Sequence, residues 1–482
     1  MINYRIIARV FSQVLILEGL FMLLSAGISL IMDEEASGPL FYSSIITLVT
    51  GILVFTPLRK EEKVYGTREG YLITTGIWIL LAAFGALPFV LSGVTDNFTD
   101  AFFESISGYT TTGATIFDDV ESLPHGILFW RSVTQWLGGV AFITLSLYVL
   151  PIVRTLNIQL PTTEYAGQPT DRIHPQIVET FKRLIIIYVV LTAAETILLL
   201  PGKMPLFDAV CHSLSTLSTG GFSTRNNNIA AFSSPYIKAV IAIFMLFAGT
   251  NLTLFYFAVK KNFKRVLTNN EFIFYILHIL GFSLLISAIL FIKSEFPPLK
   301  ALQNGFFHVI SIVTTTGFYT ENFSKWGNLA IMLIFILMFT GGMAGSPSGG
   351  IKIIRLLIIA RNTRAESRKS VHPYAFMPVY IDQKRVPQTI VFNLLVFITL
   401  YFITLCIGTL IIALMNYDVI TSLSTAASML GNIGPAIGTF GPFTNYGDLP
   451  AAGKWFLTFL MLAGRLELLT VVVLFTRSSF RG

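Results

Sequence analysis

Four short stretches of glycine and hydroxyl residues recur along the chain. The first three read Thr-Thr-Thr-Gly (110–113), Ser-Thr-Gly-Gly (218–221) and Thr-Thr-Thr-Gly (314–317), and a weaker copy, Gly-Asn-Ile-Gly, ends at residue 434. Rings of backbone carbonyls can replace the water around a dehydrated cation. Glycine reaches the backbone angles that turn carbonyls inward, and hydroxyls add oxygen ligands or hydrogen bonds. These residue types therefore indicate cation coordination.

Taken alone, any one of these stretches could be a turn or a helix C-cap. Four copies in equivalent places favour four loops that line one pore. Oxygen chemistry does not by itself choose potassium over sodium. The predicted ion-binding residues are Thr111, Thr112, Gly113, Thr219, Gly220, Gly221, Thr315, Thr316, Gly317, Asn432, Ile433 and Gly434.

A short amphipathic segment precedes the first stretch. It runs from Asp100 to Tyr109, which is too short to cross a membrane. Asp100 and Asp208 stand near the predicted starts of the first two such helices, where acidic residues are favourable. The opposite, partially negative helix ends would then point to the pore centre and favour cations.

The remaining chain reads as an integral membrane protein. It has 482 residues, of which 54% are hydrophobic and only 12% are charged. Ten segments are apolar and long enough to cross a membrane: 10–31, 40–57, 71–92, 127–150, 184–201, 236–258, 272–292, 328–360, 390–415 and 454–476.

The four stretches fall between pairs of these segments. The predicted fold is therefore an all-α polytopic membrane protein. It has four parallel span–re-entrant pore loop–span repeats in a pseudo-fourfold arrangement, plus two extra N-terminal transmembrane helices. The expected units are an N-terminal helix pair (1–70), followed by pore repeats 1 to 4 at 71–160, 161–262, 263–362 and 363–482.

The distribution of charge supports this topology. With both termini in the cytoplasm, 24 of the 33 lysines and arginines lie in cytoplasmic segments, as the positive-inside rule requires. This distribution argues against nucleic acid binding as the reason for the net charge of +7. The external segments collect acids, which either attract cations to the mouth or serve ordinary loop solubility.

Residues 341–350 interrupt the apolar segment 328–360 near its middle. They contain five glycines and a proline, which cannot continue a stable helix. The alternatives are a helix kink at a close helix contact and a flexible loop that gates the pore. The gate candidates are Gly341, Gly342, Gly345, Ser346, Pro347, Gly349 and Gly350.

Arg465 lies within the last apolar segment, where a charge is costly and indicates function. It either forms a structural ion pair with Glu467 or Glu195, or faces the pore below the four loops and opposes cation leakage. We expect the second, and we expect a neutral replacement to raise basal flux.

The chain resembles the Trk/Ktr/HKT superfamily of cation transporters, and its TrkH-type branch most closely. The resemblance covers nearly the whole chain and rests on the four stretches, residues 135–139 (Gln-Trp-Leu-Gly-Gly), the segment from Gly341 to Lys352, and Arg465. The extra N-terminal helix pair also fits the TrkH branch. The fourth stretch departs from the Thr-x-Gly pattern in a way that TrkH-like members share.

The resemblance implies a potassium-selective subunit of a bacterial uptake system, because glycine at all four positions goes with potassium preference in this superfamily. It also implies that the intramembrane loop and the arginine form the gate. Potassium is then the transported ion, and no organic cofactor is expected in the chain. A sodium or other monovalent cation transporter of the same superfamily is the alternative.

The resemblance further implies a homodimer in the lipid of the bacterial inner membrane, with a cytoplasmic TrkA-type nucleotide-binding partner. Whether transport is channel-like or coupled to protons stays open. The basic cluster that begins at Lys352 and Arg355 could dock an acidic partner or lipid headgroups.

Other functions find little support. The segment from Gly345 to Lys352 only partly matches a phosphate-binding loop, because the lysine comes one position late. We expect no enzyme, since the sequence has no metal-ligand spacing and no nucleophile motif. His212 and His308 share the repeat position of Glu104, which predicts packing behind the loops rather than a metal site. Cys211 and Cys406 are expected to be small buried side chains.

Overall fold

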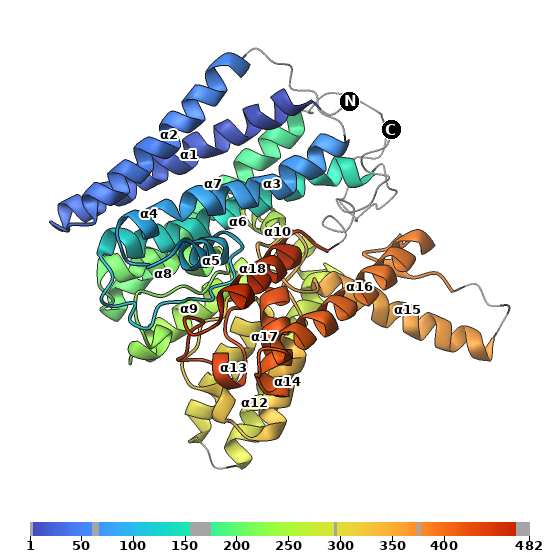
Figure 1. The fold of residues 1–482 in the computed structure, drawn as a ribbon. Helices are drawn as coiled ribbons and strands as arrows, with labels where there is room; N and C mark the ends of the chain where they lie inside the picture. Colours follow the sequence, from blue (N-terminus) through green and yellow to red (C-terminus); the bar gives the residue numbers. More distant parts are fainter. Residues whose placement is uncertain are drawn as a thin grey trace.

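The structure is a computed structural model that describes residues 3–59, 67–154, 175–293, 296–372, 374 and 377–468. It is built almost wholly of helices (Figure 1). The boundary expected between repeats 1 and 2, at residues 160 and 161, lies outside the described residues, as does the chain from residue 469 onwards.

Two long helices form the N-terminal pair, α1 (Tyr4–Ile31) and α2 (Ser37–Leu58). Asn3 caps α1, because its side-chain oxygen accepts hydrogen bonds from the backbone N–H groups of Arg5 and Ile6. The two helices lie side by side along one edge of the molecule (Figure 1). The packing of α1 against α3 and α6 joins this pair to the rest of the chain.

Four units follow, each with a short helix between longer ones. The first contains α3 (Thr67–Gly85), α4 (Leu87–Leu91), the short α5 (Phe98–Tyr109) and α6 (His125–Arg154). The second contains α7 (Pro175–Leu199), η1 (Leu200–Gly202), the short α8 (Leu206–Leu217), η2 (Asn228–Ala231), α9 (Pro235–Ala248), α10 (Leu252–Val259) and the connecting α11 (Phe263–Leu267).

The other two units repeat this plan. The third contains α12 (Asn270–Ile292), the short α13 (Pro298–Val313), η3 (Phe323–Lys325), α14 (Asn328–Leu337) and α15 (Ile353–Val371). The fourth contains α16 (Gln388–Ala413), the short α17 (Val419–Gly431), η4 (Gly438–Phe440) and α18 (Ala451–Arg465). We call α5, α8, α13 and α17 the pore helices.

Within the described residues, six helices are long and apolar enough to cross a membrane, and up to seven if a bent pair counts as one span. Four of the ten expected spans differ from a continuous helix. Segment 71–92 is divided between α3 and α4. Segment 236–258 bends by 100° between α9 and α10. Segment 328–360 breaks into α14 and α15, and segment 454–476 is helical through Arg465. The predicted all-α polytopic fold is nevertheless correct.

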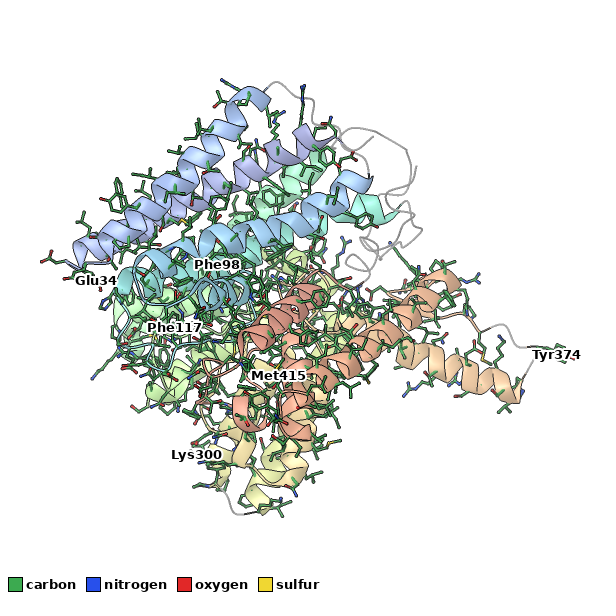
Figure 2. The ribbon with its side chains drawn as sticks, viewed as in Figure 1. Glu34, Phe98, Phe117, Lys300, Tyr374 and Met415 are labelled. Atoms are coloured by element: carbon green, nitrogen blue, oxygen red, sulfur yellow. The ribbon has the colours of Figure 1, made fainter. Side chains whose placement is uncertain are left out.

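Exposed apolar side chains cover the outer faces of the long helices, for example Leu53 on α2, Leu284 on α12 and Leu410 on α16. Water would disfavour such faces and lipid accepts them. The side chains in Figure 2 extend outward from all sides of the helix bundle.

Helix α15 extends away from the body of the molecule (Figure 1). Its first half packs Ile354, Leu357 and Ile358 against α16 and a small hairpin of β1 (Tyr380–Ile381) and β2 (Lys384–Arg385). Tyr374, beyond its far end, is fully exposed (Figure 2).

Candidate functional site

The four glycine stretches adopt the same backbone conformation. The glycine of each has a positive φ, which is 81° at Gly113, 79° at Gly221, 76° at Gly317 and 98° at Gly434. The residue two positions earlier also has a positive φ, between 53° and 57°, at Thr111, Thr219, Thr315 and Asn432. Non-glycine residues rarely adopt this conformation, so its occurrence four times marks one repeated structure.

This agreement explains the divergent fourth stretch. Asn432 occupies the place of the threonines, and asparagine tolerates the left-handed conformation better than most residues. The residue after it in each stretch donates its backbone N–H to the carbonyl five positions back, as Thr112 does to Ser107 and Ile433 to Ser428, both at 2.9 Å. This bond caps the C-terminus of each pore helix. Each stretch therefore does form a helix C-cap, as one alternative predicted, and the chain continues from this cap into a loop.

The four stretches come together as a closed ring. A Cβ added to Gly113 would strike the carbonyl oxygen of Gly220, and one added to Gly221 would strike that of Thr316. Likewise, Gly317 faces the carbonyl of Ile433, and Gly434 faces that of Thr112. Each glycine therefore faces the next stretch in order, and the fourth returns to the first. We call Gly113, Gly221, Gly317 and Gly434 the ring glycines, and the oxygens of Thr112, Gly220, Thr316 and Ile433 the ring carbonyls.

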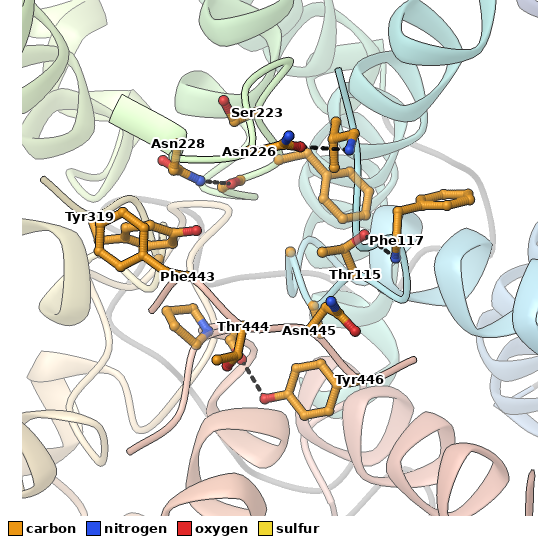
Figure 3. A pocket seen from close by; sticks show the side chains of 18 of the residues that line it. Thr115, Phe117, Ser223, Asn226, Asn228, Tyr319, Phe443, Thr444, Asn445 and Tyr446 are labelled. Atoms are coloured by element: carbon orange, nitrogen blue, oxygen red, sulfur yellow. Dashed lines mark hydrogen bonds between the residues drawn. The ribbon is translucent and has the colours of Figure 1, made fainter. Parts of the chain in front are cut away.

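A polar cavity of about 80 Å³ adjoins the ring glycines. Figure 3 shows its wall, to which all four units contribute residues. Two side chains in this wall bind glycine carbonyls, since Asn228 donates to Gly221 at 3.2 Å and Tyr446 donates to Gly434 at 2.9 Å. The cavity gives the ring a polar entrance.

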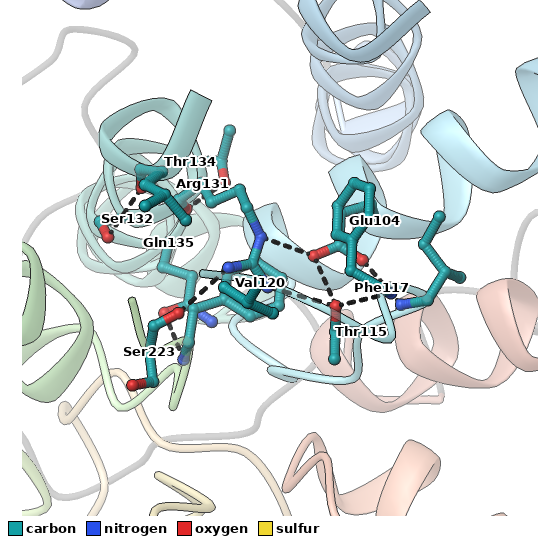
Figure 4. Close-up of polar contacts among 12 residues, drawn as sticks. Glu104, Thr115, Phe117, Val120, Arg131, Ser132, Thr134, Gln135 and Ser223 are labelled. Atoms are coloured by element: carbon teal, nitrogen blue, oxygen red, sulfur yellow. Dashed lines mark hydrogen bonds and ion pairs between the residues drawn. The ribbon is translucent and has the colours of Figure 1, made fainter. Parts of the chain in front are cut away.

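A buried ion pair braces the first stretch from behind (Figure 4). Nε of Arg131 on α6 lies 2.8 Å from Oε1 of Glu104 on α5, and both side chains are almost fully buried. Glu104 also accepts the backbone N–H of Ile116, while Arg131 donates to the carbonyl of Ser223 in the second unit. This pair therefore links the segments that follow the first and second ring glycines.

In the second and third units, His212 and His308 contact the segment that follows the ring glycine, as Glu104 does in the first unit. His212 lies 2.9 Å from the hydroxyl of Ser223, and His308 accepts the backbone N–H of Thr320 at 3.4 Å. The predicted packing of these positions behind the loops is confirmed. No group of metal-ligating side chains occurs among the residues described.

Most acids near the cavity have a partner. Asp208 pairs with Arg225 at 2.6 Å, Asp100 pairs with Lys454 at 2.5 Å, and Asp118 accepts from Asn445. The acids therefore hold loops together and neutralise basic residues at this mouth. Neither cation attraction nor loop solubility is tested by these contacts, so both alternatives for the acidic segments stay predictions.

Two carboxyl groups in the loops have lowered pKa values. Burial alone would raise the pKa of Glu34, but hydrogen bonds from His125, Gly126 and Ser29 lower it below the ordinary value of 4.5. A hydrogen bond from the side chain of Asn226 lowers the pKa of Asp119. Glu34 lies at the turn between α1 and α2 (Figure 2), so its bonds attach this turn to the start of α6.

Residues 341–350 form an irregular segment that touches the ring stretches. The backbone N–H of Gly349 donates to Oγ1 of Thr315 at 2.7 Å. Gly349 also lies so close to the carbonyl of Gly431 that a Cβ would not fit. Gly345 and Gly350 have positive φ values of 81° and 64°, which only glycine adopts easily. The segment is thus a folded loop against the third and fourth stretches, and a simple kink is excluded.

Arg465 binds this loop. Its guanidinium donates to the carbonyl of Pro347, and to that of Gly138 on α6 at 3.1 Å. Within the described residues, neither expected acid pairs with it, since Glu467 pairs with Arg355 and both oxygens of Glu195 lack a hydrogen-bond partner. The ion-pair alternative is therefore wrong, and Arg465 and the loop lie together.

Two expectations need correction. Lys352 is buried, and its ammonium group binds the carbonyl of Ser346 at 3.1 Å and that of Ser348, so it fastens the loop instead of docking a partner. Cys211 is buried as expected, but Cys406 is exposed. Cys406 lies on the apolar helix α16, where Ile403 and Ile407 are also exposed.

Two residues hold the site in roles that were not predicted from the sequence, although Gln135 was among the residues that carry the resemblance. Gln135 contacts the second stretch from α6, and Glu271 on α12 accepts the backbone N–H of Ala344 in the loop at 2.7 Å. Gln135 carried a signal, because an amide within an apolar helix needs a polar partner. Glu271 looked like an ordinary acid at a helix start.

These features define an integral membrane protein with four re-entrant units around one ring. The chain belongs to the TrkH family of cation transport proteins, whose family model matches residues 40–295 and 291–480.

The chain is 35% identical to the Trk system potassium uptake protein TrkH of Halomonas elongata, over 99% of this chain and 100% of that protein. It is 34% identical to the protein of the same name from Escherichia coli K12, with the same coverage. The crystal structure of the potassium transporter TrkH from Vibrio parahaemolyticus superimposes with a TM-score of 0.92 at 31% identity, over 100% of both chains.

Proposed function

We propose that this chain is the ion-translocating subunit of a potassium uptake system in the bacterial inner membrane, with both termini in the cytoplasm. Potassium passes through the ring, where the ring carbonyls and the threonine hydroxyls replace its water. The observation that supports this most directly is the closed order in which each ring glycine faces the carbonyl of the next stretch. The relatives named as potassium uptake proteins support the choice of ion.

The loop 341–350 is the proposed gate. It lies against Thr315 and Gly431, so it contacts the ring stretches, and it is held by Arg465, Lys352 and Glu271. Flow requires the loop to leave this position. The positive charge of Arg465 at the same place opposes cations while the loop is seated.

Dimerisation and regulation by a TrkA-type nucleotide-binding subunit complete the proposal. They rest on the family relationship, and the projecting α15 offers a surface for such contacts.

Purified protein in lipid vesicles tests the function. We expect potassium uptake that sodium does not match, and growth of a potassium-transport-deficient bacterium at low potassium. Equal permeability to both ions would favour the alternative of a general monovalent cation transporter. Flux under imposed ion and pH gradients, with and without the partner, separates channel-like flow from proton symport.

A further inference from the structure

We propose that Gln135 is a positioning residue that sets the ion preference of the ring through the carbonyl of Gly220. The proposal rests on the proposed function of the ring. Gln135 lies on α6 and is fully buried. Its Nε2 donates to the Gly220 carbonyl at 2.6 Å, and its Oε1 accepts the backbone N–H of Phe222 at 3.1 Å. One side chain thus holds the backbone on both sides of Gly221.

The orientation of this amide follows from its partners. A backbone N–H can only donate, so the amide oxygen must face Phe222. The amide nitrogen must then face Gly220, whose carbonyl can only accept. Both ends are satisfied in this orientation, and the reversed amide would satisfy neither.

This contact makes the ring unequal. Across the described part of the chain, no side chain donates a hydrogen bond to the ring carbonyls of Thr112, Thr316 or Ile433. Asn432 reaches the first stretch, but it donates to the hydroxyl of Thr112 and not to the carbonyl. Among the described residues, a side-chain amide therefore holds the ring carbonyl of the second stretch and of no other.

The consequence for ions follows from the two lone pairs of a carbonyl oxygen. One accepts from Gln135, and the other remains for a cation in the ring. An oxygen held from behind resists movement toward a smaller ion. Gly220 itself cannot carry a Cβ, because that atom would strike the Gln135 amide, so the two groups are in close contact. Gln135 therefore keeps the ring wide enough to favour potassium over sodium.

The test replaces Gln135 with methionine, which has a similar length, no hydrogen-bond donor and only a weakly accepting sulfur. Both bonds of the amide are then lost. We expect the potassium-to-sodium permeability ratio in lipid vesicles to fall about fivefold, as loss of the hydrogen bond to the Gly220 carbonyl allows. The control is Ser132→Ala on the same helix. The Ser132 hydroxyl donates to the carbonyl of Leu128 and lies next to Cys211 on α8, and neither partner belongs to the ring stretches. A purely structural role would lower both fluxes together and leave the ratio unchanged, which would overturn the proposal.

A second pair of variants covers the case in which Q135M does not fold. Gly220→Ala pushes on the same amide from the other side, so it should lower the same ratio. Where both single variants fold, their effects should not add, because they disturb one contact. An unchanged ratio in Gly220→Ala, or additive effects, would contradict the proposal.

The variant Gly221→Ser distinguishes a failure of the role of Gln135 from a failure of the proposed function of the ring. A changed ratio in Gly221→Ser with an unchanged ratio in Q135M overturns the role of Gln135 alone. An unchanged ratio in both variants overturns the proposed function of the ring as well.

Discussion

The backbone N–H of Gly349 donates a 2.7 Å hydrogen bond to the side-chain oxygen of Thr315. Gly349 belongs to the proposed gate and Thr315 to the third ring stretch. The two parts of the site are therefore in direct contact, with no intervening residue. If the loop gates the pore as proposed, opening must break this bond, and its strength then contributes to the closed state.

Thr315→Val should raise basal potassium flux. Valine keeps the shape of threonine but cannot accept from Gly349, and loss of one neutral hydrogen bond shifts an equilibrium about fivefold. The measurement is potassium efflux from vesicles without a partner subunit. Thr409→Val on α16 is the control, because the Thr409 hydroxyl donates to the carbonyl of Leu405 in its own helix. Equal flux in the two variants would contradict a gating role for this bond.

Arg465→Gln should also raise basal flux. The change removes a positive charge and weakens the bonds to Pro347 and Gly138. Arg265→Gln, which alters a basic side chain that lies over Phe257, provides the comparison. Unchanged or lower potassium flux in folded Arg465→Gln would refute the assigned role.

Gly113→Ser should lower the preference for potassium over sodium. The added Cβ strikes the Gly220 carbonyl and must displace a ring carbonyl. Gly93→Ser is a matched control, because Gly93 has a similar φ of 70° but open space around it. The control carries the backbone strain without the contact, so a similar loss of selectivity in both variants would argue against the ring.

Glu104→Leu should destabilise the protein strongly. Removal of one partner from a buried ion pair leaves Arg131 uncompensated, which typically costs about 3–5 kcal/mol. Thermal unfolding in detergent measures the loss. The double variant Glu104→Leu/Arg131→Met should recover part of it, since no charge is then buried alone. If the double variant were less stable than the single one, the pair would not be the cause.

The hydrogen bonds by which Glu34 attaches the α1–α2 turn to the start of α6 should weaken at acidic pH. The pKa of Glu34 is lowered in the folded protein, so its ionised form stabilises the fold above the ordinary value of 4.5. That contribution is lost as the pH falls through the lowered pKa. Unfolding midpoints of the unsubstituted protein and Glu34→Gln should differ at pH 7 and converge as the pH falls below 4.5. A constant difference would show that another property of Glu34 is responsible.

Repetition made most of the architecture predictable. Glycine and threonine recur at matching places between apolar segments, so the four units and their short helices could be inferred. The orientation in the membrane that charge bias predicts stays a prediction. The twist of the fourth stretch became clear only from φ values, because Asn432 and threonine share no side-chain shape. Asn432 and the three threonines share a backbone conformation with positive φ, which cannot be recognised from the residue types alone.

The supporting contacts were harder to infer. Gln135 and Gly220 are 85 positions apart, and Glu271 and Ala344 are 73 apart. Such pairs depend on how helices rotate against one another, and hydrophobic periodicity gives little information about rotation in helices that are apolar on all sides. Lys352 was misread for a related reason, since a basic residue next to a basic cluster resembles a surface residue until its partners are seen.

The ring is made from one polypeptide, so each of its four quarters is encoded separately. In a pore built from four identical subunits, one changed codon alters every quarter at once. Here a substitution at Gly113 leaves the other three ring glycines intact. Under the proposed function, ion preference can therefore change in small inherited steps, one quarter at a time.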